Sequence, residues 1–252
     1  RGRWESFTKH PRNHGILRVA EKGCWILPKR NGGQVARSEF DHSKLTTDMF
    51  KNFTLCLGAL LCVISADAQF KGLVYEEIDN KGLVPGKTYR IYAQMEAEGD
   101  VVDAIFGDGD DYLEVKSTAP FFQHERGANA ANELQRSEVQ SIEGLPYDSW
   151  VTIGYEDNYM NALTAFLMDF SEFEGGGRLY TDNGAWFVTP DMRQAAAGPD
   201  GKLLLMQLTT EGDIFCHINL HGRTRPLPSK DDPMNLVPKL IDARNIELSI
   251  KN

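Results

Sequence analysis

The segment LLLMQLTTEGDIFCHINL, residues 203–220, decides the fold class of this chain. Residues 203–208 are apolar on both faces of an extended strand, which is typical of a central strand in a two-layer core. Residues 214–220 alternate instead, and their apolar members share one face: Ile214, Cys216, Ile218 and Leu220. The polar residues 210–213 between them predict a turn. The segment therefore predicts two strands in succession, the first buried on both faces and the second on one.

Short runs of this kind recur on both sides of the segment. In residues 88–95, TYRIYAQM, every second side chain is apolar, as in a half-buried strand. Residues 198–201, GPDG, suit a type I turn with proline second and glycine fourth. Further strands are predicted at 70–78, 101–106, 113–117, 150–154 and 185–188. So many short strands predict an all-β fold, an antiparallel β-sandwich of jelly-roll type.

The connections are less uniform than the strands. Residues 107–111, GDGDD, predict the turn of a hairpin between their flanking strands. Residues 124–144 are polar and predict a long loop with one helical turn, whereas 162–170 leave strand and short helix open. Residues 223–252 predict a Pro-rich irregular tail that can end in a last strand at 246–250.

Residues 49–68, MFKNFTLCLGALLCVISADA, have the order of a secretory signal peptide. Lys51 gives a positive start, residues 53–64 are apolar, and Ala66-Asp67-Ala68 fits an A-x-A cleavage site. The apolar run is well short of the roughly 18 to 20 residues that span a bilayer. We therefore expect a protein that is secreted or at the cell surface, with no membrane span after signal cleavage.

Residues 1–48 carry ten Lys/Arg and five Asp/Glu and show no apolar periodicity. Two interpretations are open: sequence upstream of a true start at Met49, or a basic extension of the protein. A signal peptide that begins so far into a chain would work poorly, which favours the first. The predicted organisation is an upstream extension at 1–48, a signal peptide at 49–68, a β-sandwich domain at 69–222 and a tail at 223–252.

The body that remains after cleavage, 184 residues from Gln69 to Asn252, is long enough for one domain with a sizeable core. It holds 16 Lys/Arg and 30 Asp/Glu, a net charge of −14. Such a charge repels phosphate backbones and anionic lipids, so nucleic acid and membrane surfaces are not expected partners. Cys216 is its only cysteine, which excludes an internal disulfide and predicts a buried, inert thiol.

Several segments together match a known pattern. They are 88–93 (TYRIYA), 104–108 (AIFGD), 121–124 (FFQH), 147–154 (YDSWVTIG), 186–190 (WFVTP) and 205–218 (LMQLTTEGDIFCHI). In order and approximate spacing this resembles a repeat module of unknown function from large secreted proteins of marine bacteria, often exported by the type IX pathway. The resemblance spans roughly residues 75–220. It implies a role outside the cell and supplies no catalytic residues.

Asp108, Asp110 and Asp111 crowd one glycine-rich stretch, and hard oxygen donors on a loop are what calcium requires. The spacing is not that of an EF-hand, because Ala119 stands where such a loop needs its last glutamate. The alternative is a solvated turn, since Asp and Gly both favour turns. Calcium is the single cofactor that the sequence suggests.

Other candidate sites have simpler explanations. His217 and His221 share a strand face with Asn219, but residues four apart on a strand lie roughly 13 Å apart, too far to share one zinc. Ser149 lacks the G-x-S-x-G elbow of a nucleophile. Trp150 and Trp186 either stack on sugars or belong to the core. Two acidic groups raise the question of a glycosidase carboxylate pair but also fit a solvated surface: Glu76, Glu77 and Asp79, and Asp169, Glu172 and Glu174.

The leading hypothesis is a secreted, non-catalytic β-sandwich module with a binding or structural role at the extracellular surface. An extracellular glycan or a cell-surface protein would be its partner. The alternatives are a secreted glycan-active enzyme on a jelly-roll scaffold and a calcium-dependent adhesin.

Overall fold

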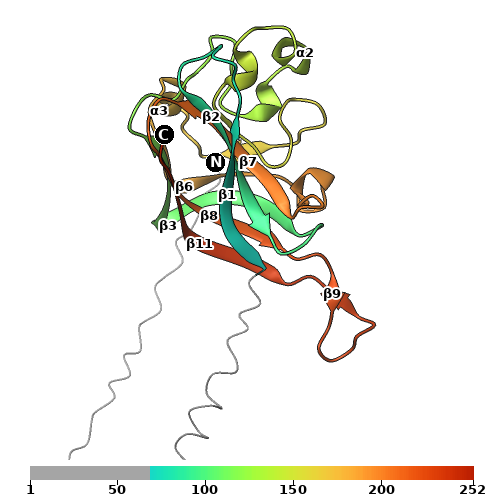
Figure 1. Cartoon of the computed structure of the whole chain (residues 1–252). Coiled ribbons are helices and arrows are strands. Elements are labelled where there is room, and N and C mark those ends of the chain that lie inside the picture. Colours follow the sequence, from blue (N-terminus) through green and yellow to red (C-terminus); the bar gives the residue numbers. More distant parts are fainter. Residues whose placement is uncertain (1–68) are drawn as a thin grey trace, which may run out of the picture. The chain divides into compact units, whose positions relative to one another are not determined.

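The computed structural model describes residues 69–252 (Figure 1). The predicted signal peptide and the interpretation of residues 1–48 lie outside the described residues and stay predictions. The strands are β1 (Phe70–Ile78), β2 (Lys87–Met95), β3 (Val101–Ser117), β4 (Trp150–Val151), β5 (Thr164–Phe166), β6 (Leu179–Phe187), β7 (Lys202–Thr210), β8 (Ile214–Arg223), β9 (Leu227–Pro228), β10 (Leu236–Val237) and β11 (Leu240–Ile250). Two single-turn α-helices, α2 (Arg136–Val139) and α3 (Ser171–Glu174), and the 3₁₀ turns Ala131–Glu133, Leu145–Tyr147 and Arg193–Ala195 complete the described part.

The strands form two main sheets. One has four strands in the order β1-β2-β7-β4, and the other has five in the order β11-β8-β3-β6-β5. The short strands β9 and β10 pair only with each other and project from one end of the ribbon (Figure 1). Every named strand pair is antiparallel. The predicted all-β, antiparallel class is thereby confirmed.

A single apolar core draws side chains from both sheets. Ile91 and Leu205 come from the four-stranded sheet and Ile105, Trp186 and Ile218 from the five-stranded sheet, all with no exposed surface. These residues occupy every second position of their strands, because successive side chains of a strand point to opposite faces. The predicted apolar face of residues 88–95 belongs to this core.

The outer face of the four-stranded sheet is covered by a second, smaller cluster. Leu204 of β7 and Trp150 of β4 pack there against Ala131, Leu134 and Leu145 of the long connection between β3 and β4. These five residues are here called the Trp150 cluster. As a result β7 is buried on both faces, as residues 203–208 predicted.

The predicted hairpin around residues 107–111 is wrong. β3 runs through this stretch as one strand, and its pairing with both β6 and β8 shifts register there. The buried side chain of Asn219 on β8 explains why no turn forms. Its Nδ2 donates hydrogen bonds to the carbonyl oxygens of Phe106 (2.9 Å) and Asp111 (2.7 Å), so the extra residues form a bulge that is held to the sheet.

The last strand is longer than predicted and belongs to the main fold. β11 begins at Leu240, pairs with β8 along its length and bulges between Ala243 and Ile246. Asn245 adopts a left-handed φ of 54°, and its N–H donates to Oδ1 of Asn219 (2.8 Å). The irregular part of the tail is therefore restricted to the residues before Leu240, and they contain the β9–β10 hairpin.

Other local predictions met with mixed results. Residues 150–154 form a strand over only two residues, β6 extends well before residue 185, and the open segment 162–170 contains β5. The turn at 198–201 is confirmed: the N–H of Gly201 donates to Gly198 (2.9 Å), and Gly201 has φ 73°. Among the described residues no helix has the length and apolar character to cross a bilayer.

Candidate functional site

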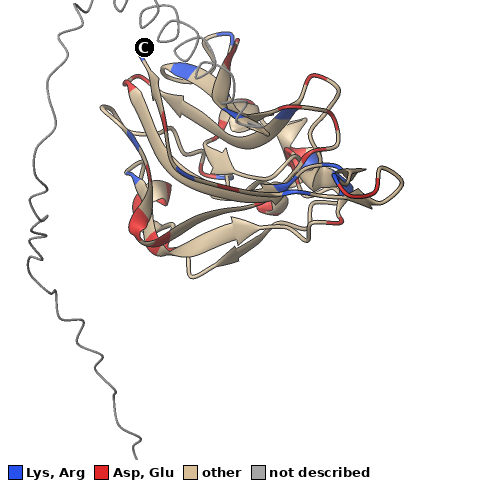
Figure 2. Ribbon diagram, turned by 90° about the horizontal axis from the view of Figure 1, so that it is seen from below, with Lys and Arg blue, Asp and Glu red and all other residues tan. Residues whose placement is uncertain are grey.

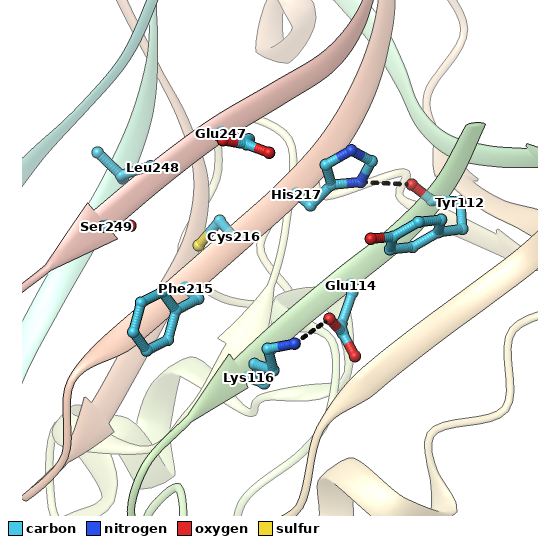
Figure 3. A pocket seen from close by; sticks show the side chains of 9 residues that line it. All are labelled: Tyr112, Glu114, Lys116, Phe215, Cys216, His217, Glu247, Leu248 and Ser249. Atoms are coloured by element: carbon cyan, nitrogen blue, oxygen red, sulfur yellow. Dashed lines mark hydrogen bonds and ion pairs between the residues drawn. The ribbon is translucent and has the colours of Figure 1, made fainter. Parts of the chain in front are cut away.

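The outer face of the five-stranded sheet carries a shallow pocket of about 200 Å³ between β3, β8 and β11 (Figure 3). Its lining residues are Tyr112, Glu114 and Lys116 from β3, Phe215, Cys216 and His217 from β8, and Glu247, Leu248 and Ser249 from β11. Most of these side chains are polar or aromatic. No cover comparable to the Trp150 cluster lies over this face among the described residues.

Strand register aligns four of the side chains on this face. Glu114 pairs with Tyr180 of β6 on one side and with His217 on the other, and His217 pairs with Glu247. Neighbouring strands lie about 4.8 Å apart, so directly paired residues stand next to each other on the same face. Tyr180, Glu114, His217 and Glu247 therefore form a row across four strands, here called the cross-strand row.

The tautomer of His217 follows from its hydrogen bond. Nδ1 lies 2.9 Å from the backbone carbonyl oxygen of Tyr112 (Figure 3). Because a carbonyl oxygen only accepts, Nδ1 carries the proton and Nε2 of the neutral ring is an acceptor. The Tyr112 ring stacks on the imidazole with centroids 4.4 Å apart and 25° between planes, which fixes the orientation of the ring.

The two tyrosines of the site extend this stack. The ring of Tyr112 lies 5.9 Å from that of Tyr180, and the guanidinium of Arg178 lies 4.9 Å above the Tyr180 ring. Both tyrosines remain more than a third exposed, at 37% and 38%. The stack thus presents ring edges and surfaces to solvent at fixed positions.

Glu114 is the charged centre of the site. Its carboxylate accepts from Lys116 (2.5 Å) and from Arg178 (3.2 Å), and its side chain is only 13% exposed. Burial favours the neutral form, but the hydrogen bonds from these two cations outweigh it and lower the pKa of Glu114. Glu114 therefore stays ionised and organises two donors beside the tyrosines.

The three aspartates predicted to bind calcium lie in the β3 bulge, and two of them, Asp108 and Asp111, face Arg244 of the β11 bulge. Nη1 of Arg244 pairs with Asp108 (3.1 Å) and Asp111 (2.8 Å), and Asn245 also donates to Asp111 (2.9 Å). These hydrogen bonds lower the pKa of Asp111. Asp110 is exposed, and the described residues contain no group of three or more acidic, His or Cys side chains arranged to hold a metal. The calcium site stays a prediction, and the ion would have to displace Arg244.

The residues of the second metal hypothesis are not brought together. Nδ1 of His221 pairs with Asp103 (2.6 Å), whereas His217 bonds to Tyr112 and lies in the pocket. Asn219 between them is buried under the two bulges, and its side chain makes hydrogen bonds with backbone groups of Phe106, Asp111 and Asn245. The two histidines have separate environments, as the strand spacing predicted.

The acidic groups considered for a glycosidase are engaged in local interactions. Glu76 pairs with Lys202 (2.6 Å), Glu77 with Lys87 (3.5 Å) and Glu172 with Arg178 (3.3 Å). Asp79 and Asp169 accept from backbone N–H groups two residues on, those of Lys81 and Ser171.

Four further residues are structural. The hydroxyl of Ser149 is buried and accepts from the Thr209 N–H (3.0 Å). Trp150 and Trp186 both lie in apolar clusters, so the core interpretation of the two is confirmed. Cys216 is buried as predicted, and burial raises the pKa of its thiol to about 12.

Sequence reasoning missed Tyr112, Tyr180 and Glu247 as members of one site. A signal exists in part, because Tyr180 alternates with the buried Leu179 and Thr181. The pairing of β3 with β6 and β8 on either side of the bulge could not be read from any of these segments alone. Comparisons with protein-family models, with curated proteins and with solved structures gave no match to this chain.

Proposed function

We propose that residues 69–252 form a secreted, non-catalytic β-sandwich module of jelly-roll type that binds an extracellular glycan on the outer face of its five-stranded sheet. The cross-strand row and the side chains that contact it carry this proposal. Tyr112 stacks on His217, and Lys116 and Arg178 pair with Glu114, so aromatic rings, an ionised carboxylate with its cations and an imidazole acceptor stand together on an uncovered sheet face. The shared apolar core of the two sheets supports the sandwich, and the predicted leader and the module resemblance support the extracellular setting.

The chemistry of a sugar matches the chemistry of this face. A sugar ring has apolar C–H surfaces that pack on aromatic side chains and hydroxyl groups that both donate and accept. Tyr112 and Tyr180 supply aromatic surface with hydroxyl groups, Lys116 and Arg178 donate, and Nε2 of His217 accepts. A few fixed polar groups beside aromatic surface are what orient a small ligand.

The charge of the domain agrees with an uncharged or weakly charged partner. Lys and Arg are scattered among the more numerous Asp and Glu rather than gathered into one basic surface (Figure 2). A net charge of −14 over residues 69–252 opposes binding to polyanions such as nucleic acid.

The test is a glycan array probed with the secreted protein, followed by calorimetric titration of the oligosaccharides that bind. Tyr112→Ala and Tyr180→Ala should each weaken binding at least tenfold. Tyr75→Ala is the matched control, because Tyr75 is a half-exposed tyrosine on β1 of the other sheet. Equal affinities for all four proteins would reject the assignment of the site.

A glycan-active hydrolase is the second candidate, and the placement of Glu114 and Glu247 on either side of His217 favours it. Two strand spacings put their backbones roughly 10 Å apart, near the roughly 6.5 to 9.5 Å carboxyl separation of inverting glycosidases. The lowered pKa of Glu114 suits the ionised partner of such a pair rather than the acid. Release of reducing ends that Glu114→Gln abolishes would establish this activity; binding without release supports the module.

A further inference from the structure

A second pocket, of about 420 Å³, lies between α2 and the loop that follows β4. Its lining includes Arg136, Tyr155, Glu156, Asp157, Tyr159 and Met160. None of these residues takes part in the cross-strand row or in the pocket around His217. Its volume is within the roughly 300 to 1,000 Å³ of small-ligand sites.

The two walls of this pocket are tied together by Asn158. Its side-chain oxygen accepts from the Arg136 N–H (3.2 Å), its amide donates to Gln135 (2.8 Å), and its backbone N–H donates to Leu134 (2.9 Å). The pocket is therefore formed by hydrogen bonds that exist before any ligand arrives, which lowers the entropic cost of binding.

The planar guanidinium of Arg136 is held in a fixed position, and part of its hydrogen-bond donors are unused. Its Nε donates to Asp157 (2.7 Å), and its guanidinium carbon lies 4.2 Å above the centre of the Tyr159 ring. Within the described residues its two Nη groups make no hydrogen bond, so they remain available to a ligand oxygen. The planar fork of an arginine suits such directed hydrogen bonding.

The charges of this pocket are balanced by pairing. Arg90 binds Glu156 with two hydrogen bonds (2.9 and 2.7 Å), and Arg136 pairs with Asp157. Beside these pairs, the side chains of Tyr159 and Met160 are exposed at 57% and 73%. Met160 has a left-handed φ of 56°, a conformation that non-glycine residues rarely adopt. Apolar surface and balanced polar groups together fit an uncharged polyhydroxylated ring better than an anion or a cation.

We propose that this pocket is a second saccharide site that takes a neutral sugar ring, so that one chain holds two glycan segments and links them. The assignment of a saccharide as the ligand rests on the proposed function. The location of the site, its preformed walls and its charge balance are independent of the cross-strand row.

The experiment is a calorimetric titration of the secreted protein with a neutral oligosaccharide that binds it, together with turbidity of the parent polysaccharide as a measure of linking. We expect two sites per chain. Tyr159→Ala and Arg136→Gln should each remove one site and abolish the turbidity, whereas Tyr112→Ala should remove the other site. Tyr75→Ala is the control and should leave both.

The outcomes separate the two proposals. One site per chain, lost in Tyr112→Ala and kept in Tyr159→Ala and Arg136→Gln, overturns this inference and leaves the proposed function standing. One site that depends on Tyr159 and not on Tyr112 supports a saccharide site in this pocket, but it rejects the binding site around Tyr112 and, with it, the linking of two glycan segments. Absence of any saccharide binding by the parent protein rejects both.

Discussion

Strands β7 and β8 follow each other in the chain, yet their environments differ. β7 is buried on both faces, by the shared core on one side and by the Trp150 cluster on the other. β8 is buried on its inner face, while Phe215, His217 and His221 on its outer face are only partly buried. The connection between β3 and β4 supplies the cover for β7, and the described residues contain no equivalent cover for β8.

This difference supports the proposed position of the binding site. A sheet face that loops cover contributes to stability, because its apolar side chains leave water. An uncovered face with aromatic and charged side chains at fixed positions contributes little to stability and is available for recognition. Mutations on β7 should therefore change folding, and mutations on the outer face of β8 should change binding.

The largest effect is expected from truncation of β7 on either face. Leu205→Ala, in the shared core, and Leu204→Ala, under the Trp150 cluster, should each lower the free energy of unfolding by about 2 to 5 kcal/mol. Urea denaturation followed by tryptophan fluorescence measures both. If Leu204→Ala has little effect, the cover over β7 is not an integral part of the fold.

Asn219 of β8 tests how much stability depends on its hydrogen bonds to the bulges of β3 and β11. Asn219→Ala leaves the carbonyl groups of Phe106 and Asp111 and the N–H of Asn245 without their partner. We expect a loss of about 2 to 4 kcal/mol, since each buried unpaired group costs roughly 1 to 3 kcal/mol. Chemical denaturation gives the value, and Asn183→Ala on the exposed part of β6 serves as a control. A loss equal to that of the control would contradict the role of Asn219.

Asp148 lies in the connection between β3 and β4 that covers β7, and its ionisation should make the free energy of unfolding depend on pH. Burial raises the pKa of Asp148 to about 6 although its carboxylate accepts from the N–H groups of His124 (2.8 Å) and Ala128 (2.9 Å). The pKa in the unfolded chain is about 3.9. The folded state therefore binds the proton more tightly, so this contribution to stability is complete below about pH 4 and is lost as the pH rises through about 6.

The size of this effect is up to about 3 kcal/mol, because one pKa unit corresponds to about 1.4 kcal/mol. Unfolding free energies measured between pH 4 and 7.5 should show the decline in the parent protein but not in Asp148→Asn. Asp182→Asn, on the exposed part of β6, should keep the parental pH profile. Parallel profiles for the parent and Asp148→Asn would refute the assignment.

Truncation of a side chain on the outer face of β8 should reduce glycan affinity and leave stability almost unchanged, in contrast to truncation on β7. His217→Ala removes a partly buried ring, so the unfolding free energy should change by no more than about 0.5 to 1 kcal/mol. Glycan affinity should fall at least tenfold, because the acceptor Nε2 and the support of the Tyr112 ring are both lost. A large loss of stability with unchanged affinity would place His217 with the structural residues.

The smallest expected effect concerns calcium. Arg244→Gln should release Asp108 and Asp111 from their ion pair and increase any stabilisation by calcium, which melting curves with and without the ion measure. Arg178→Gln, away from this cluster, is the control. If calcium leaves the melting temperatures of the parent and of Arg244→Gln unchanged, the calcium-dependent adhesin is rejected.

Local pattern was sufficient for most strands of the described residues. The alternation in 88–95, the continuous apolar run in 203–208 and the turn residues at 198–201 each report an environment that neighbouring residues reveal on their own. The Pro-rich residues 224–239 were predicted to be irregular, and the strands within them are the two-residue β9 and β10. The buried state of Cys216 also followed from the alternation of its predicted strand, whereas for Trp150 and Trp186 the sequence left sugar stacking and core packing open.

The sequence by itself determined that residues 69–252 are acidic, hold a single cysteine and are built from antiparallel strands, because charge, cysteine count and strand alternation are properties of composition and near neighbours. Only the tertiary structure decided that GDGDD is a bulge rather than a turn, since Asn219, more than a hundred residues later, bonds the backbone of that stretch. The cross-strand row arose in the same way. Its members come from four strands, and strand order and register are set by packing between distant segments.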